Sequence, residues 1–294
     1  MDDRFSLDTA TVRRSFNAAA ANFDSAAVLH REVRQRALDR LKFLRDAPAV
    51  ILDLGAGTGQ SSGWLKTEYP QARVLAIDSA LGMVQRHRQH IGAWRRLLGR
   101  GQELICADAR ALPLRDASVD WIFANLLIPW CGSPERLFAE ALRVLKPGGS
   151  LHFSSVGPDT LVELRRAWAS VDNGEHVHPF IDMHDLGSAL TQSGFAEPVL
   201  DVERFTLTYS DFEALRRDLK STGSRNALPR RTRGLYGRRT LAQLAAAYDL
   251  LRQDGKLPAS VEVIYGHAWR VDRPAKSPGD GEFRISIDSI RGRR

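Results

Sequence analysis

Cysteine is scarce in this sequence, and it has no long apolar run. Two cysteines, Cys106 and Cys131, occur among 294 residues, too few for a disulfide framework or a paired-cysteine metal site. The longest apolar stretch, residues 121–131, is too short to span a bilayer. Residues 1–4 are largely charged, and the apolar segment of a secretory signal does not follow them. We therefore expect a cytoplasmic protein in a reducing compartment, without a metal and without stable membrane association.

Positive charge is concentrated in one segment. The composition, 43% hydrophobic and 26% charged, is globular, and the formal net charge is +7. Residues 216–239 carry nine basic side chains and one acidic side chain, which leaves the remaining chain close to neutral. A local basic surface favours docking of an acidic partner, with an exposed solubility helix or nucleic-acid affinity as alternatives. Tyr236 is the only aromatic residue in this segment, so base stacking is poorly supported and we expect no nucleic-acid partner.

The first half of the chain alternates short apolar runs with amphipathic segments. Apolar spacing predicts a helix over residues 12–46, and Pro48 marks its end. The apolar runs predict strands over residues 50–54, 74–77, 104–107, 119–124 and 151–155, with a turn at 146–149. This alternation favours an α/β fold whose parallel sheet is covered by helices on both faces.

The pattern changes after residue 155. It predicts helices over 158–169, 184–193, 211–220 and 239–253, and strands over 199–209 and 261–269. We divide the chain into an N-terminal helical segment (1–48), a core (49–209), a basic helical insertion (210–258), a last core strand (259–270) and a disordered tail (271–294).

Polar residues stand at or near the ends of four successive predicted strands. They are Asp53, Asp78, Asp108 and Asn125. A single residue of this kind is most often a helix cap, but ligands of parallel sheets bind beyond the carboxyl ends of the strands. Four such positions in succession favour a binding site at this edge.

A glycine cluster, Gly55, Gly57 and Gly59 with Thr58 among them, links the first predicted strand to the next helix. Glycine lets the backbone turn tightly and lets a ligand approach without a Cβ clash, and the helix amino terminus offers free N–H groups to an anion. A dinucleotide fingerprint needs its third glycine one residue later, where Gln60 stands. The loop alone does not decide between a dinucleotide and another cofactor.

The run from Ile51 to Gly59 resembles the first motif of class I S-adenosylmethionine-dependent methyltransferases. The resemblance continues through residues 107–109, 112–114, 118–120 and 146–149. It implies a Rossmann-like, mostly parallel seven-stranded sheet with a helical insertion before the last strand, and S-adenosylmethionine as co-substrate. The cofactor-binding residues it implies are Asp53, Gly55, Gly57, Thr58, Gly59, Asp78, Met83, Asp108, Ala109 and Asn125.

The resemblance also implies separate roles for these residues. Asp78 would accept hydrogen bonds from the ribose hydroxyls. Asp108 and Ala109 would meet the adenine, and Asn125 would line the path to the methyl group. Asp53 would orient the loop or the ammonium group of the cofactor.

Flanking segments resemble one family within this class, the malonyl-acyl-carrier-protein O-methyltransferases. The matching segments are residues 16–31, 125–132, 157–164, 218–226 and 261–269. The family commonly has Tyr where this chain has Phe23, and Gln where it has His30. The resemblance implies methylation of the free carboxylate of malonyl-acyl carrier protein, or of malonyl-CoA, in an ester-forming step that primes pimeloyl and biotin synthesis.

This reaction has few chemical requirements. A malonyl carboxylate is ionised near neutral pH and needs no general base, so catalysis depends on alignment and on excluding water. Lys220 and an arginine of the basic insertion are our candidates for holding the carboxylate, with Asn125 and Trp130 in the wall of the site. The expected docking residues for the carrier protein are Arg225, Arg230, Arg231, Arg233, Arg238 and Arg239. A related enzyme acting on a quinone or a respiratory-complex assembly protein, and a nucleic-acid-binding protein, are the alternatives.

Overall fold

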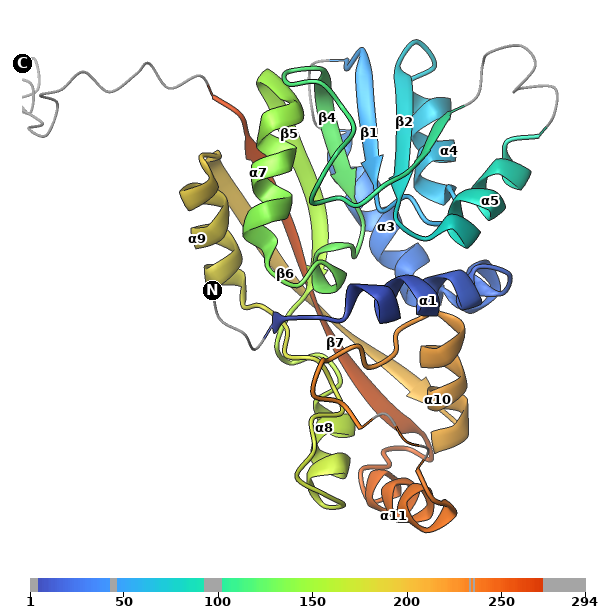
Figure 1. Cartoon of the computed structure of the whole chain (residues 1–294). Helices are drawn as coiled ribbons and strands as arrows, with labels where there is room; N and C mark the ends of the chain where they lie inside the picture. Colours follow the sequence, from blue (N-terminus) through green and yellow to red (C-terminus); the bar gives the residue numbers. More distant parts are fainter. Residues whose placement is uncertain (1–4, 43–46, 93–101, 233, 235, 272–294) are drawn as a thin grey trace, which may run out of the picture.

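The computed structural model describes residues 5–42, 47–92, 102–232, 234 and 236–271. Its centre is one seven-stranded sheet in the order β3-β2-β1-β4-β5-β7-β6 (Figure 1). Adjacent strands from β3 to β5 pair in parallel, and β7 runs antiparallel between β5 and β6. The bounds are β1 Val50–Leu54, β2 Arg73–Asp78, β3 Glu103–Cys106, β4 Val119–Ala124, β5 Leu145–Val156, β6 Ala196–Tyr209 and β7 Leu257–Trp269. The predicted Rossmann-like sheet is therefore confirmed.

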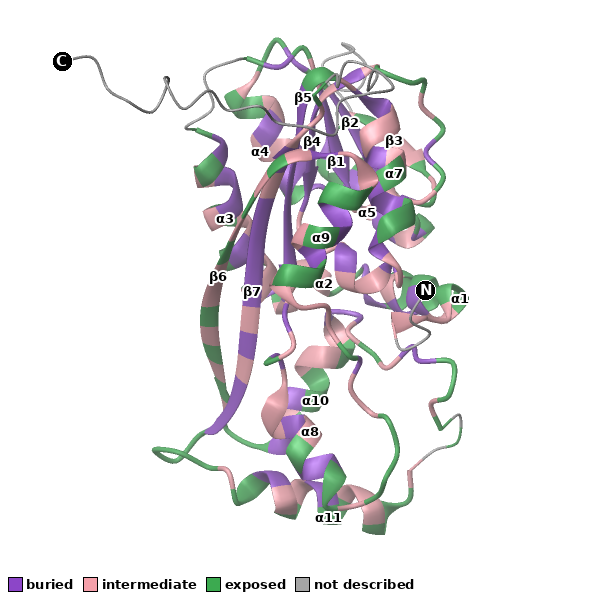
Figure 2. Cartoon of the chain, turned by 90° about the vertical axis from the view of Figure 1, so that its left-hand side faces the viewer, coloured by how far each residue is buried: buried purple, intermediate pink, exposed green. Residues whose placement is uncertain are grey.

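Helices cover both faces of the sheet (Figure 2). On one face lie α7 (Pro134–Val144) and α9 (Met183–Ser193), which bury Phe138 and Leu190 against the strands. On the other lie α3 (Val28–Leu41) and α4 (Gln60–Glu68), which bury Leu38 and Leu65. α5 (Leu81–His90) contacts β2 and β3. Because both faces are covered, β1 is almost wholly apolar, as in other doubly covered parallel sheets.

The prediction of one long N-terminal helix is wrong. Three helices occupy this region: α1 (Thr9–Ala19), α2 (Phe23–Ala26) and α3. The carboxylate of Asp8 caps α1 by accepting from the Thr11 N–H, and Ala27 leaves helical geometry at ψ 51°. The breaks allow α1 to cross the end of the sheet instead of continuing along it (Figure 1).

A second lobe extends the sheet at one end. The far halves of β6 and β7 are covered by α8 (Val162–Ala169), α10 (Phe212–Ser221) and α11 (Arg238–Asp249). Tyr248 is fully buried there, and its hydroxyl donates to the Pro258 carbonyl over 2.8 Å. In the sequence, α10 and α11 follow β6 and precede β7, which confirms the predicted helical insertion before the last strand. The domain boundaries stay an interpretation, since α8, from the predicted core, packs with the insertion.

Two further expectations meet the structure differently. The predicted turn at residues 146–149 lies inside β5, where the β4–β5 register shifts and Gly148 has φ 79°. Arg233, and the predicted tail from residue 272 onward, lie outside the described residues.

Candidate active site

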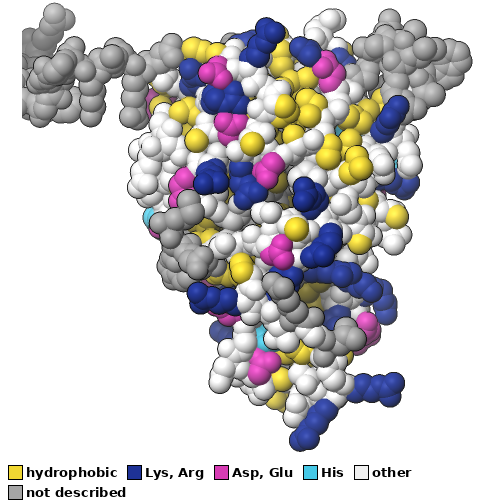
Figure 3. Space-filling view, in the orientation of Figure 1, with side chains coloured by type: hydrophobic (Ala, Val, Ile, Leu, Met, Phe, Trp, Pro, Cys, Tyr) yellow, Lys and Arg dark blue, Asp and Glu magenta, His cyan; other side chains and the backbone are white. Residues whose placement is uncertain are grey.

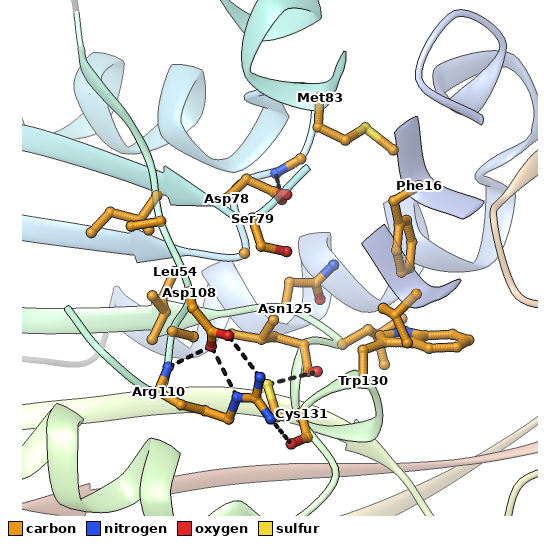
Figure 4. Close-up of a pocket in the computed structure, with 18 of the residues that line it drawn as sticks. Phe16, Leu54, Asp78, Ser79, Met83, Asp108, Arg110, Asn125, Trp130 and Cys131 are labelled. Carbon is orange, nitrogen blue, oxygen red and sulfur yellow. Dashed lines mark hydrogen bonds and ion pairs between the residues drawn. The ribbon is translucent and has the colours of Figure 1, made fainter. Parts of the chain in front are cut away.

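A pocket lies at the carboxyl ends of β1, β2 and β4 (Figure 4). The sheet supplies Leu54, Asp78 and Asn125 to its wall, and α1 supplies Phe16 from the opposite side. Of the predicted cofactor residues, the pocket is lined by Gly55, Gly57, Asp78, Met83, Asp108, Ala109 and Asn125. It therefore brings together side chains from widely separated parts of the sequence at the sheet edge where a ligand was expected.

The glycines of the loop differ in what a side chain at each position would meet. All have positive φ, at 72°, 55° and 88° for Gly55, Gly57 and Gly59. A Cβ on Gly59 would lie 2.0 Å from the His87 ring, so this glycine permits packing inside the protein. A Cβ on Gly57 would meet no protein atom within 4 Å. Gly57 is thus the loop position where the bare backbone faces the pocket, as a closely approaching ligand requires.

Asp78 fixes the loop from the end of β2. One carboxylate oxygen accepts from the Gly57 N–H at 2.9 Å, and the other accepts from the Ala80 N–H at 2.8 Å. Burial raises the pKa of this carboxyl, and the two backbone N–H groups oppose the rise. Each oxygen retains a further lone pair for a hydroxyl donor. The placement is compatible with the predicted ribose contact.

Three predicted cofactor residues, Asp53, Thr58 and Gly59, do not line the pocket, and Asp53 and Thr58 are buried. Asp53 is buried and accepts from the Ser62 hydroxyl of α4. Burial raises the pKa of Asp53 to about 7. The Thr58 hydroxyl donates to Asp24 of α2 at 2.6 Å. Both side chains brace the loop, and a direct contact between either of them and a cofactor stays a prediction.

Asp108 is paired with Arg110, a partner that sequence reasoning missed. Two guanidinium nitrogens of Arg110 lie 2.7 and 3.0 Å from the Asp108 carboxylate oxygens (Figure 4). Hydrogen bonding from Arg110 lowers the pKa of Asp108, so the carboxylate is ionised at neutral pH. The spacing of two residues gave no signal, because the pairing depends on the turn after β3.

Asn125 is held on both sides of its amide at the end of β4. Its nitrogen donates to the His30 carbonyl at 3.2 Å, and its oxygen accepts from the Ser154 hydroxyl at 2.9 Å. The next residue, Leu126, has φ 52°, and its N–H donates to Ser154. A leucine in this left-handed conformation is strained, and such strain concentrates at functional sites.

A second cavity, with a volume of about 590 Å³, adjoins the first pocket. It lies in the second lobe and is lined mainly by apolar side chains of α8, α10, α11, β6 and the segment after α10. His30, Leu126 and Trp130 line both spaces and form the junction between them. The Trp130 ring meets Phe16 edge-on at 5.2 Å and His178 at 5.4 Å between ring centroids.

Four basic side chains line this second cavity: Arg216, Lys220, Arg225 and Arg231. Lys220 and Arg225 are exposed. Arg231 pairs with Asp8 at 3.2 Å and donates to the Thr11 hydroxyl, which fastens the basic segment to α1. The predicted docking residues Arg230, Arg238 and Arg239 do not line the cavity, and Arg216, which does, was not among the residues predicted. A docking role for the predicted arginines stays a prediction.

Among the described residues, no helix is both long and apolar enough to cross a membrane, and no group of three or more His, Cys, Asp or Glu side chains is placed to hold a metal ion.

Comparison with known proteins agrees with this geometry. Residues 52–153 match the model of the methyltransferase domain family. A solved putative methyltransferase from Bacillus halodurans shares the fold, with a TM-score of 0.56 and 18% identity over 81% of this chain and 98% of that one. A solved complex between the Haloferax volcanii Trm112 methyltransferase activator and a putative methyltransferase gives a TM-score of 0.55. The sequence identity is 18%, over 90% of this chain and 99% of that one. Fold and site together define a methyltransferase of the Rossmann-like class.

Curated relatives narrow the class. The malonyl-[acyl-carrier protein] O-methyltransferase of Laribacter hongkongensis is 48% identical over 98% of both chains. Its namesake from Methylovorus sp. is 48% identical over 91% of both. This chain belongs to the malonyl-[acyl-carrier protein] O-methyltransferase family.

Proposed function

We propose that this protein transfers a methyl group from S-adenosylmethionine to the free carboxylate of a malonyl thioester carried by acyl carrier protein. One observation supports this most directly: a pocket at the strand ends meets a separate, larger cavity at His30, Leu126 and Trp130. Two substrates bound in these adjoining spaces would meet at the side chains that line both. Membership of the family supports the choice of substrate, and the ester would prime pimeloyl and biotin synthesis.

The residues of the first pocket fit S-adenosylmethionine, which supplies an electrophilic methyl group on a sulfonium. The open space beside Gly57 accommodates the close approach of a ligand to the backbone. Asp78 offers acceptor oxygens to ribose hydroxyls, and Asp108 and Ala109, which line the same pocket, would meet the adenine. Met83, buried in α5, closes the pocket. These assignments follow the predicted roles.

The reaction requires the protein to position its two substrates and does not require a proton transfer. One carboxylate oxygen attacks the methyl carbon, a C–O bond forms, the C–S bond breaks and its electron pair returns to sulfur. Because the nucleophile is already an anion, no base is required. Cys131 is not a competing nucleophile, because burial raises the pKa of its thiol to about 12. Leu126 and Trp130 line both spaces and present apolar surface at the junction, which suits a reaction that requires water to be excluded.

The second cavity suits the thioester arm. Its apolar wall fits an acyl and pantetheine chain, and Lys220 and Arg225 offer cations to the anionic groups of the substrate. Basic side chains also lie over the region of α1 and α10 and near α11 (Figure 3). Acyl carrier protein is acidic, so this surface would steer its approach. A cytoplasmic location remains a prediction from the sequence.

The proposal is tested by incubating the protein with methyl-labelled S-adenosylmethionine and malonyl-acyl carrier protein. A base-labile methyl ester is expected, and acetyl-acyl carrier protein, which lacks the free carboxylate, should give none. Malonyl-CoA in a parallel reaction reports the preference for carrier. If the protein binds S-adenosylmethionine but forms no ester, or esterifies both carrier proteins alike, the proposal is wrong.

A further inference from the structure

The junction between the two cavities contains a histidine whose ring is not accounted for. His30, on α3, lines both the cofactor pocket and the second cavity. Its backbone carbonyl accepts from the Asn125 amide, so its position is tied to the end of β4. The ring lies edge-on against Phe23, with centroids 5.0 Å apart. Phe23 fixes the ring without offering it a hydrogen bond.

The two ring nitrogens of His30 differ in their surroundings. Nδ1 is sealed from solvent and has no hydrogen-bond partner among the described residues. Burial, aided by the nearby positive charge of Arg34, lowers the pKa of His30 to about 4, so the ring is neutral at pH 7. A sealed lone pair costs less than a sealed, unpartnered N–H. The proton therefore belongs on Nε2, which is not one of the sealed, unpartnered side-chain atoms found among the described residues. Since the residue lines both spaces, Nε2–H is the donor this ring can offer to a ligand there.

We infer that His30, through Nε2–H, binds the substrate carboxylate at the junction and holds its second oxygen while the first attacks the methyl group. This inference rests on the proposed function, and it gives a substrate-binding role to a residue that the sequence marked only as a departure from the family. The inference assigns the carboxylate to His30 in place of Lys220, the candidate from the sequence. Lys220 and Arg225, elsewhere in the lining of the second cavity, are then available for the phosphate of the carrier arm.

A neutral donor suits this position better than a cation. A full positive charge against the carboxylate would stabilise the charge that must leave the oxygen as the new bond forms, and the attack would slow. A single N–H from an uncharged ring orients the carboxylate and withdraws little of that charge. The Trp130 indole, which lines both spaces, adds only a neutral group. The lining common to both spaces thus carries no formal charge at neutral pH.

The test compares His30→Leu with His30→Gln in the full-length protein. Leucine removes the donor, whereas the glutamine amide places an N–H near the position of Nε2. We expect His30→Leu to lower kcat/KM for malonyl-acyl carrier protein about tenfold to hundredfold, mainly through KM for this substrate. His30→Gln should recover at least half of the logarithmic loss. The Kd for S-adenosylmethionine and the melting temperature should stay close to wild type in both variants.

His184→Leu is the matched control, because the side chain of His184 is 85% exposed on α9 and lines neither cavity. The inference is overturned if His30→Leu keeps kcat/KM within twofold of wild type. It is equally overturned if His30→Gln is as impaired as His30→Leu, or if affinity for S-adenosylmethionine falls in step with activity. A wild-type protein that forms no malonyl ester overturns the proposed function and this inference together, whereas an active wild type with an unaffected His30→Leu overturns the inference alone.

Discussion

Gly57 provides the sharpest test of where the cofactor lies. Replacing it with alanine adds one methyl group to the loop without removing the N–H that Asp78 accepts. The new Cβ would meet no protein atom within 4 Å. It would project into the space assigned to S-adenosylmethionine, so the substitution should harm binding far more than folding.

Two contributions determine the expected size of the effect. Alanine at φ 55° costs about 1 kcal/mol of folding stability, a loss of about 2 °C in Tm for a chain of this size. Overlap with a closely seated ligand costs about 1–3 kcal/mol, which raises the Kd for S-adenosylmethionine about 5- to 150-fold. The two contributions separate because one is seen without ligand and the other only with it.

Gly255→Ala is the matched control. Gly255 has φ 73°, its Cβ would also meet nothing within 4 Å, and it lies exposed in the turn before β7. The two variants should lose similar stability in thermal melts, while calorimetric titration with S-adenosylmethionine separates them. Gly59→Ala should behave differently again, because its Cβ would overlap the His87 ring and lower Tm well beyond either. Equal affinities for Gly57→Ala and Gly255→Ala would refute the placement of the cofactor.

Three further outcomes are expected. Asp78→Ala should weaken S-adenosylmethionine binding by about 1.5–3 kcal/mol for each lost charged hydrogen bond; unchanged affinity in calorimetry would contradict the ribose contact. Lys220→Ala should lower kcat/KM for malonyl-acyl carrier protein about tenfold, whereas exposed Lys256→Ala should not; steady-state kinetics of both variants would decide. Asp53→Asn should remove a pH dependence of the free energy of unfolding. The pKa of Asp53, raised to about 7 in the folded protein, means that the folded state binds a proton more tightly than the unfolded state. In urea unfolding, the stability of the wild type relative to the variant should therefore fall as pH rises from about 4 to 7. If the free energy of unfolding changes with pH in the same way in the wild type and in Asp53→Asn, this expectation is wrong.

The sheet and its glycine loop were predictable because their signals are local. Short apolar runs such as residues 50–54 and 119–124 must become strands buried on both faces, and Gly57 follows the first of them directly. The strand-end positions of Asp78 and Asn125 follow from the same pattern, since carboxyl ends of parallel strands share one edge.

The rest of the site depends on contacts between distant segments. His30 is brought to the junction by the packing of α3 on the sheet, and its carbonyl accepts from Asn125, 95 residues further on. The amphipathic spacing of residues 12–46 satisfies one long helix as well as three short ones, and packing over the pocket decides between them. Asp53 has the residue type and spacing of a ligand contact, yet it is buried behind the loop against Ser62. No single-sequence signal distinguishes a side chain in front of a loop from one behind it.

The two longest strands carry a mechanical consequence. β6 and β7 pair without interruption from Val199–His267 to Tyr209–Leu257, so one ladder runs from the sheet into the second lobe. Rotating that lobe as a hinged body would break this ladder, which has no loop at which to bend. We therefore expect exchange of the adenosyl donor and its spent form to depend on α1 and α2, which contribute Phe16 and Phe23 to the pocket wall. Because Arg231 pairs with Asp8 at the start of α1, a displacement of α1 would also shift the basic segment, and donor exchange would be linked to the surface proposed to receive the carrier.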